Sequence, residues 1–165
     1  MKKLNSVYVG VGTNLGDKLN NIQLAYKLIQ SEIGEIVRKS HVYKTPPWGF
    51  ESDEYFYNSV IEIKTFFDPE KLLNKLQSIE RVLGKKQKFK IGYSSRLIDL
   101  DIIDFNNQII DSKRLTIPHS HVSKRNFVLY PLKDVCPNWI HPITKRTIQE
   151  LLNLINEDVM IEKVV

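Results

Sequence analysis

Hydrophobic and polar residues in the first half of the chain follow the period of a strand in some segments and of a helix in others. Valines alternate with other residues over positions 7–11, which predicts a strand because successive strand side chains point to opposite faces. Apolar residues then recur every three to four positions over 19–33, which predicts a helix. Apolar runs at 36–43 and 56–65 predict the second and third strands, with a proline-containing break at 45–49.

The second half begins with a helix whose two ends carry typical signals. Asp68 is a typical N-cap residue, and Pro69 suits the first helical turn. An apolar stripe continues to Leu83, after which Gly84 suits the C-terminal cap. A basic loop follows, and the apolar run at 96–103 predicts the fourth strand.

Shorter elements complete the chain. The pair Asn106–Asn107 predicts a tight turn that returns through residues 109–110. We expect helices near residues 122–130 and 148–155 and a last strand near residues 160–164.

The order of the main elements predicts the fold class. Strand, helix, strand, strand, helix, strand is the split β-α-β pattern, so we expect a ferredoxin-like α+β sandwich with helices packed on a sheet that contains antiparallel strands. No repeat, linker or low-complexity tract interrupts the chain, and its length suits one core. We therefore expect residues 1–165 to form a single domain.

Composition and charge narrow the class of protein. The chain is 42% hydrophobic and 26% charged, which is ordinary for a globular protein. Its single cysteine, Cys136, cannot form an internal disulfide, and no signal peptide or apolar run of membrane-spanning length is visible. We therefore expect a cytoplasmic protein without a membrane partner. The net charge of +5 suits either a nucleic acid or a smaller polyanion such as a nucleotide.

Two aspartates inside the fourth predicted strand are the most informative polar residues. Asp99 and Asp101 are two positions apart, so in a strand they share a face, with Cα atoms roughly 6.6 Å apart. Ionised carboxylates at that spacing repel each other unless a cation or a proton intervenes, and Mg²⁺ is typically held by one or two carboxylates with substrate phosphates. A solvated strand face is the alternative. Aspartate is disfavoured in strands, and the nearby Arg96 supplies positive charge, which together favour the metal interpretation.

The loop of residues 84–95, which leads into this strand, carries four lysines. Charge alone favours a solvated loop. The functional alternative is a lid whose lysines, together with Arg96, close over a polyphosphate and exclude water.

A third set of residues suits a flat heterocycle. The proline-stiffened segment 45–49 offers preset backbone groups, Asn58 offers donors and an acceptor, and Phe56 and Phe127 offer faces for stacking. Each of these residues alone also fits an ordinary core role. The glycines of segment 10–16 do not have the spacing of a dinucleotide fingerprint, so we interpret them as a strand-to-helix turn.

Histidines give a weaker signal. His119 follows a proline and suits either contact with a phosphate or ribose or an ordinary surface position. His121 and His141 do not repeat the spacing of metal ligands, so we expect no zinc site.

An ordered set of motifs extends over nearly the whole chain. The central one is segment 96–103, with the sequence Arg-Leu-Ile-Asp-Leu-Asp-Ile-Ile. The others, in chain order, are Gly12–Leu15, Tyr43–Pro47, Tyr57–Asn58, Gln77–Glu80, Arg114–His119 and Arg125–Leu132. Together and in this order they resemble the 6-hydroxymethyl-7,8-dihydropterin pyrophosphokinase family of folate biosynthesis, and segment 96–103 resembles the family signature.

The resemblance implies an ATP-dependent diphosphotransferase that moves pyrophosphate from ATP to the hydroxymethyl group of the pterin and releases AMP. It implies two Mg²⁺ ions on Asp99 and Asp101 and catalytic roles for these aspartates and Arg96. Separately, we expect small-molecule substrates, no nucleic acid, and a monomer. The implied pterin contacts are Thr45, Pro46, Trp48, Phe56, Asn58 and Phe127. The implied ATP contacts are Gln77, Glu80, Lys85, Lys88, Arg96, Arg114, Thr116, His119 and Arg125.

Two departures from the family's pattern lie in the basic loop. Lys85 stands where many members have arginine, and lysine lacks the bidentate geometry of a guanidinium. Residues 93–95, Tyr-Ser-Ser, stand where Trp-Gly-Pro often occurs. We expect these changes to affect loop motion and rate rather than the class of reaction.

Two other functions remain to be tested. A basic ferredoxin-like domain that binds nucleic acid is the main alternative, although the aromatic pattern of RNA-binding members is missing and two aspartates would repel phosphates without a metal. A metal-dependent nuclease is the other.

Overall fold

The structure is a computed structural model and describes residues 2–46, 54–84, 97–155 and 160–165. Its strands are β1 (Asn5–Thr13), β2 (Glu35–Lys39), β3 (Tyr43–Thr45), β4 (Phe56–Thr65), β5 (Asp99–Phe105), β6 (Ile110–Asp111), β7 (Thr116–Ile117) and β8 (Glu162–Lys163). Its α-helices are α1 (Lys18–Glu32), α2 (Pro69–Leu83), α3 (Asn126–Val135) and α4 (Ile148–Leu154), and a short 3₁₀ helix spans Val122–Lys124.

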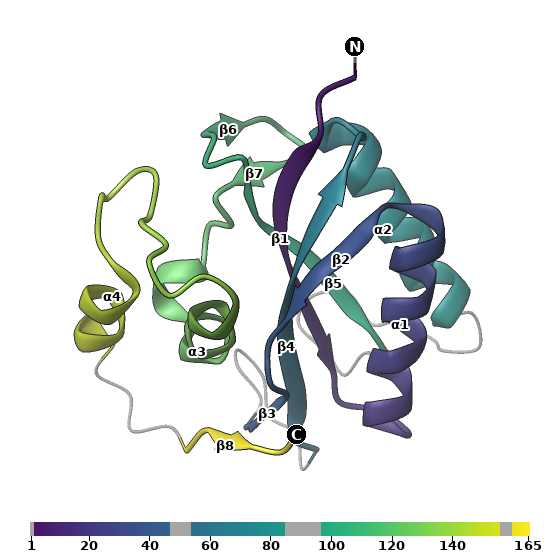
Figure 1. The fold of residues 1–165 in the computed structure, drawn as a ribbon. Helices are drawn as coiled ribbons and strands as arrows, with labels where there is room; N and C mark the ends of the chain where they lie inside the picture. The colour runs from purple at the N-terminus through teal and green to yellow at the C-terminus, as the bar shows by residue number, and fades with distance from the viewer. Residues whose placement is uncertain (1, 47–53, 85–96, 156–159) are drawn as a thin grey trace.

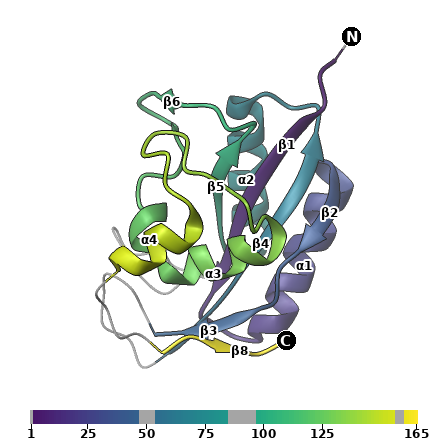
Figure 2. The same cartoon turned by 60° about the vertical axis from the view of Figure 1, so that its left-hand side comes forward.

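A six-stranded antiparallel sheet forms the centre of the molecule. Its strands follow the order β5-β1-β4-β3-β8, and β2 also pairs with β4. Helices α1 and α2 cover one face of the sheet, and α3 lies on the other face with α4 beside it (Figures 1 and 2). The arrangement confirms the predicted ferredoxin-like α+β fold.

Alternation along the strands produces two cores, one on each face. In β1, Val7, Val9 and Val11 are buried in the larger core beneath α1 and α2. In β4, Ile61 and Ile63 enter the same core, whereas Val60 packs beneath α3 in the smaller core. Because successive side chains of a strand point to opposite faces, the second face of the sheet is left free to carry the site as well as α3.

The helix-end signals of α2 are confirmed. The Asp68 carboxylate accepts a hydrogen bond from the backbone N–H of Lys71 at 2.8 Å, and Pro69 occupies the first turn. At the other end, the N–H of Gly84 donates to the carbonyl of Glu80 at 2.8 Å. α2 packs against β5, the strand at one edge of the sheet.

The second predicted strand, residues 36–43, is two strands rather than one. β2 and β3 both pair with β4. Lys39 lies opposite Ile61 and Tyr43 lies opposite Asn58, so the β2–β3 side has one residue more than the β4 side and the ladder is interrupted. At the break, the hydroxyl of Ser40 accepts the Val60 N–H at 2.8 Å and replaces a ladder bond.

Two further predictions need correction. The turn at Asn106–Asn107 is present, with φ of 52° and 57°, but β6 after it pairs with β7 in a separate two-stranded sheet instead of returning along β5. The predicted helix 122–130 is a 3₁₀ turn followed by α3, because Arg125 between them has extended backbone (φ −114°, ψ 95°). Within the described residues, no helix is long and apolar enough to cross a membrane.

Candidate active site

The floor of the site is the face of the sheet that α3 covers. Asp99 and Asp101 in β5 are half-buried and line one cavity, while Leu100 between them is buried in the core beneath α1 and α2. The prediction that the two aspartates share a face is confirmed. In the sheet register, Asp101 lies opposite Gly10 and Asp99 lies opposite Gly12.

These two glycines shape the cavity, and our interpretation of them as part of a turn is wrong. Gly10 and Gly12 lie inside β1, and Gly16, with φ of 65°, is the glycine that the turn requires. A Cβ on Gly12 would lie 2.8 Å from the Oδ1 of Asn58 in the neighbouring strand. Without side chains in this row, the sheet surface between the aspartates of β5 and Asn58 of β4 stays open.

The wall opposite the aspartates consists of residues predicted to contact a heterocycle. Asn58 donates a hydrogen bond from its side-chain amide to the Thr45 hydroxyl at 3.0 Å, so β3 and β4 present these two groups together. Pro46, Phe56 and Phe127 complete this part of a cavity of about 350 Å³. Five of the six predicted pterin contacts are thus brought together, and the sixth, Trp48, lies outside the described residues.

His119 and Arg125 lie on the third side of the cavity, near the aspartates. The Nε2 of His119 is 3.9 Å from the Oδ2 of Asp101, and its Nδ1 accepts a hydrogen bond from the His121 backbone N–H at 3.1 Å. Burial, followed by the charge of Arg125, lowers the pKa of His119 to about 4. The ring is therefore neutral at ordinary pH, and its proton is on Nε2, facing Asp101.

Arg125 brings a buried positive charge to the cavity. Its side chain is 9% exposed, and the guanidinium carbon lies 5.6 Å from the centre of the Phe127 ring. A cation over an aromatic face at this distance is attracted to the ring. The cavity therefore has an anionic edge on β5 and a cationic, aromatic edge at the start of α3.

Glu80, a predicted ATP contact, does not line this cavity; it contacts β5 from the side of the sheet that α2 covers. Its carboxylate accepts the Leu100 backbone N–H at 3.3 Å. Burial and the negative charge of Asp99 raise the pKa of Glu80 to about 8. Gln77, three positions earlier in α2, is half-buried and is not among the described residues that line the cavity.

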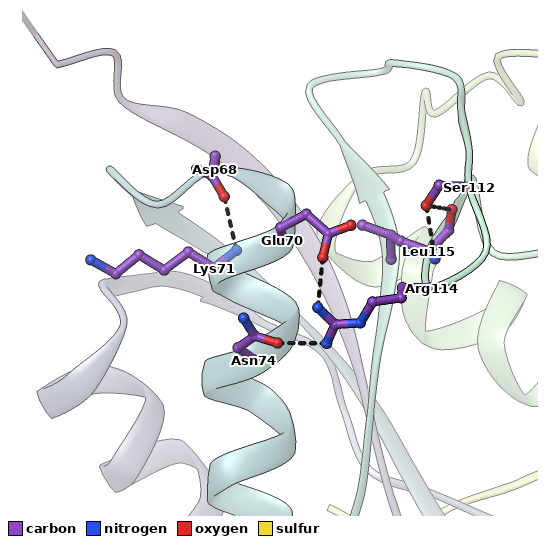
Figure 3. A network of polar contacts seen from close by, with 7 residues as sticks. All are labelled: Asp68, Glu70, Lys71, Asn74, Ser112, Arg114 and Leu115. Atoms are coloured by element: carbon purple, nitrogen blue, oxygen red, sulfur yellow. Dashed lines mark hydrogen bonds and ion pairs between the residues drawn. The ribbon is translucent and has the colours of Figure 1, made fainter.

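Arg114 and Thr116 also lie away from the cavity within the described part of the chain. The Arg114 side chain points to α2, where it contacts Glu70 Oε2 at 3.0 Å and Asn74 Oδ1 at 2.6 Å (Figure 3). Thr116 is exposed in β7. The remaining predicted contacts, Lys85, Lys88 and Arg96, lie outside the described residues.

Several lining residues were not predicted from the sequence. Ser120, His121, Ile103, Val122 and Val128 line the cavity as well. Val11 and Ser59 border it although their side chains point to the opposite face of the sheet, where Val11 is in the larger core and the Ser59 hydroxyl bonds Tyr26. Most belong to the segments that carry the predicted residues. Only the strand register and the packing of α3 bring them to one cavity.

The aspartate pair fits a magnesium site. Within the described residues, no three histidine, cysteine, aspartate or glutamate side chains gather as a metal-binding group. A cation here would therefore have the Asp99 and Asp101 carboxylates and take its other ligands from phosphate and water, which is usual for Mg²⁺. Burial first, and then the nearby Asp99 carboxylate, raise the pKa of Glu80, and a cation on the aspartate pair would offset the second of these effects.

Comparison with known sequences gives one consistent result. The family model of 7,8-dihydro-6-hydroxymethylpterin-pyrophosphokinase matches residues 8–137. The 2-amino-4-hydroxy-6-hydroxymethyldihydropteridine pyrophosphokinase of Aquifex aeolicus is 39% identical over 145 residues, which are 88% of this chain and 89% of that protein. The protein of the same name from Bacillus subtilis is 37% identical over 133 residues, or 80% of this chain and 78% of its own.

Solved structures support the fold. A Plasmodium falciparum HPPK-DHPS structure superposes with a TM-score of 0.76 at 19% identity. The match covers 93% of this chain but only 44% of that longer chain.

Proposed function

The chain belongs to the 7,8-dihydro-6-hydroxymethylpterin-pyrophosphokinase family, an enzyme family of folate synthesis, and we propose that the cavity between β5, β4 and α3 is its active site. There, pyrophosphate passes from ATP to the hydroxymethyl group of the pterin, and AMP is released. One observation carries the proposal. The two carboxylates of β5 and the predicted pterin contacts of β3 and β4 line the same cavity, separated only by the two glycines of β1.

The wall formed by β3 and β4 suits the pterin. The Asn58 amide is already oriented by Thr45, so its free hydrogen-bonding capacity is directed at a ligand edge without further ordering. Phe56 and Phe127 supply aromatic faces from two different elements. Pro46 lines the same wall, and the proposed role of Trp48 rests on the family resemblance.

The opposite edge suits the polyphosphate of ATP. We propose that Asp99 and Asp101 hold two Mg²⁺ ions. Bound Mg²⁺ would neutralise phosphate charge and polarise the reacting oxygens. The neutral His119 can donate from Nε2 to a phosphate oxygen, and the Arg125 guanidinium adds fixed positive charge. The other proposed ATP contacts rest on the resemblance; they are Gln77, Glu80, Lys85, Lys88, Arg96, Arg114 and Thr116.

The reaction itself needs positioning more than covalent help from the protein. The hydroxymethyl oxygen attacks the β-phosphorus in line, a P–O bond to this oxygen forms, and the bond to the AMP oxygen breaks. Binding in this cavity would bring the attacking group and the phosphate to the same sheet face, which would convert the encounter into an intramolecular step. We propose that the carboxylate of Asp99 or Asp101 accepts the hydroxyl proton.

The family match does not favour the alternative of a basic nucleic-acid-binding domain. We propose small-molecule substrates alone and a cytoplasmic monomer. A salt-dependent affinity for RNA without AMP formation would support the alternative instead, and sedimentation would report the oligomeric state.

Pterin-dependent release of AMP tests the proposed function. Protein is incubated with Mg²⁺, ATP and the pterin alcohol, and AMP is quantified against matched reactions with no pterin or with a 6-methyl analogue that lacks the hydroxyl. We expect AMP only with the alcohol, in equal amount with pterin pyrophosphate. AMP at the background level of both controls would overturn the proposal.

A further inference from the structure

The part of the proposed pterin site that Thr45 and Pro46 form is held in place by contacts that lie outside the cavity. The segment between β2 and β3 runs past the C-terminal end of α3 before it reaches Thr45 and Pro46. Arg38, in β2, donates to the Val135 carbonyl at 3.0 Å, so the end of β2 is attached to the end of α3 just before this segment begins.

Asp134, on the last turn of α3, makes the central contacts. Its Oδ2 accepts two hydrogen bonds, one from the Tyr43 hydroxyl at 2.8 Å and one from the His41 backbone N–H at 3.1 Å. The Tyr43 side chain is buried, at 7% exposure, although its hydroxyl reaches the more exposed Asp134. One carboxylate oxygen therefore joins helix α3 to the strand that leads directly into the wall.

The C-terminal residues brace the same segment from its other edge. The Val42 N–H donates to the Val165 carbonyl at 2.9 Å, and the Val164 N–H donates to the Val42 carbonyl at 2.8 Å. β8 continues the pairing, with Tyr43 opposite Lys163. Because β8 covers the edge of β3, movement of β3 along the sheet would break this pairing as well as the contacts of Asp134.

The two elements that Asp134 joins, β3 and α3, each carry residues of the proposed pterin site. Tyr43 lies opposite Asn58 in the sheet, and Thr45, two positions later on the same strand, holds the Asn58 amide. Phe127 lies in the first turn of the same helix that carries Asp134 in its last turn. The helix is a rigid element, so fixing its C-terminal end to β3 limits how far Phe127 can move from Thr45.

We infer that Asp134 is a positioning residue for the pterin, which holds β3 and α3 at the separation that a flat ring requires. The inference rests on the proposed function. Asp134 does not line the cavity, so it acts through Tyr43 and the β3 backbone without touching substrate. Its loss is therefore expected to weaken pterin binding more than ATP binding. The pterin contacts come from β3, β4 and α3, whereas the aspartates of the ATP edge lie on β5 and only Arg125 adjoins α3.

Four variants separate positioning from general stability. Asp134→Ala removes both hydrogen bonds, Asp134→Asn keeps an acceptor oxygen of the same size, and Tyr43→Phe removes only the hydroxyl. Lys133→Ala, an exposed neighbour on the same helix turn, is the matched control. For each protein, KM is measured for the pterin alcohol and for ATP, the Kd of the pterin alcohol is measured by calorimetry, and Tm is recorded.

We expect Asp134→Ala to raise the pterin KM and Kd roughly tenfold, the effect of about 1.4 kcal/mol in binding. The KM for ATP should stay within a factor of about two. Tyr43→Phe should give a smaller increase of the same kind, Asp134→Asn should restore most of the affinity, and Lys133→Ala should match the wild type. If Asp134→Ala is poorly folded, Tyr43→Phe and Asp134→Asn carry the comparison.

Equal changes in both KM values, or a lower Tm with an unchanged pterin Kd, would overturn the inference because they indicate stability alone. Wild-type protein without pterin-dependent AMP release would instead remove the proposed function, and the inference with it. Active wild type with an unaffected Asp134→Ala variant would remove the positioning role and leave the function standing.

Discussion

Asp99 and Asp101 are the residues on which the proposed chemistry depends most. Replacing either with asparagine keeps the size and a ligand oxygen but removes the charge that Mg²⁺ requires. We expect pterin-dependent AMP release to fall by roughly a hundredfold or more for Asp99→Asn and for Asp101→Asn. Tm should not fall, since removal of one carboxylate relieves its repulsion with the other aspartate.

The matched control for this prediction is Asp111→Asn, an exposed aspartate in β6. It should retain wild-type turnover. Wild-type turnover in either Asp99→Asn or Asp101→Asn, measured with Mg²⁺ in excess, would remove the metal-binding role of that residue.

Gly12 offers a second test at single-residue scale. In Gly12→Ala the new Cβ would meet the Asn58 Oδ1 at 2.8 Å, and the Asn58 amide must turn away from Thr45. Alanine costs less backbone entropy than glycine in a strand, so we expect Tm to be maintained while the Kd for the pterin alcohol rises roughly tenfold. Calorimetric titration measures the Kd.

Gly10→Ala is the natural comparison, because its Cβ would lie 3.4 Å from the Ile103 side chain, an ordinary contact, and away from Asn58. It should bind the pterin alcohol more tightly than Gly12→Ala does. Equal affinity of the two variants would argue against Asn58 as a pterin contact.

The sequence predicts some of these residues for clear physical reasons and misses others. Asp99 and Asp101 follow from the two-residue period of a strand, which any apolar run reveals. Gly10 and Gly12 have the same period, but their importance depends on which side chains lie opposite them in β4 and β5. That register is a tertiary property, so a local interpretation assigned them to a turn.

At the scale of elements, the connection between α3 and α4 contains a buried histidine that depends on its neutral form. His141 is 6% exposed, and its Nδ1 accepts the backbone N–H groups of Ile143 and Thr144, each at 3.2 Å. Burial lowers the pKa of His141 in the fold, whereas the unfolded chain has the ordinary value of about 6.5. The unfolded state therefore binds more protons as pH falls below this value.

The resulting pH dependence has a definite sign. The contribution of His141 to the free energy of unfolding is fully present above about pH 6.5 and is lost as pH falls toward the lowered folded pKa. We expect His141→Gln to be less stable than wild type at pH 7.5, with a difference that shrinks between pH 6.5 and 5. Urea unfolding at each pH measures it, and a difference that grows on acidification would contradict the assignment.

Element boundaries show where sequence patterns stop being sufficient. The Asp68 cap of α2 is local, since donor and acceptor lie three residues apart, and it was predicted correctly. The break between β2 and β3 depends on the Ser40 hydroxyl meeting Val60, twenty positions away, so an apolar run alone does not reveal it. The partner of β6 is likewise settled by packing.

At the scale of the whole molecule, the central sheet carries the larger hydrophobic core on one face and the proposed active site on the other. The larger core beneath α1 and α2 lies on one face, and the cavity lies on the other, between the sheet and α3. Element order predicted this architecture because the split β-α-β pattern leaves few ways to pair the strands. The attachment of β8 to β3 was not predicted, since nothing in a short strand specifies a partner far away in sequence.

A crystal structure with Mg²⁺, a non-hydrolysable ATP analogue and the pterin alcohol tests the central claim most directly. The account predicts metal density on the carboxylates of Asp99 and Asp101, with phosphate oxygens between them and His119. It also predicts the pterin ring between Phe56 and Phe127, with its hydrogen-bonding edge on Asn58. A pterin bound outside this cavity, or phosphates that do not approach the two aspartates, would contradict it.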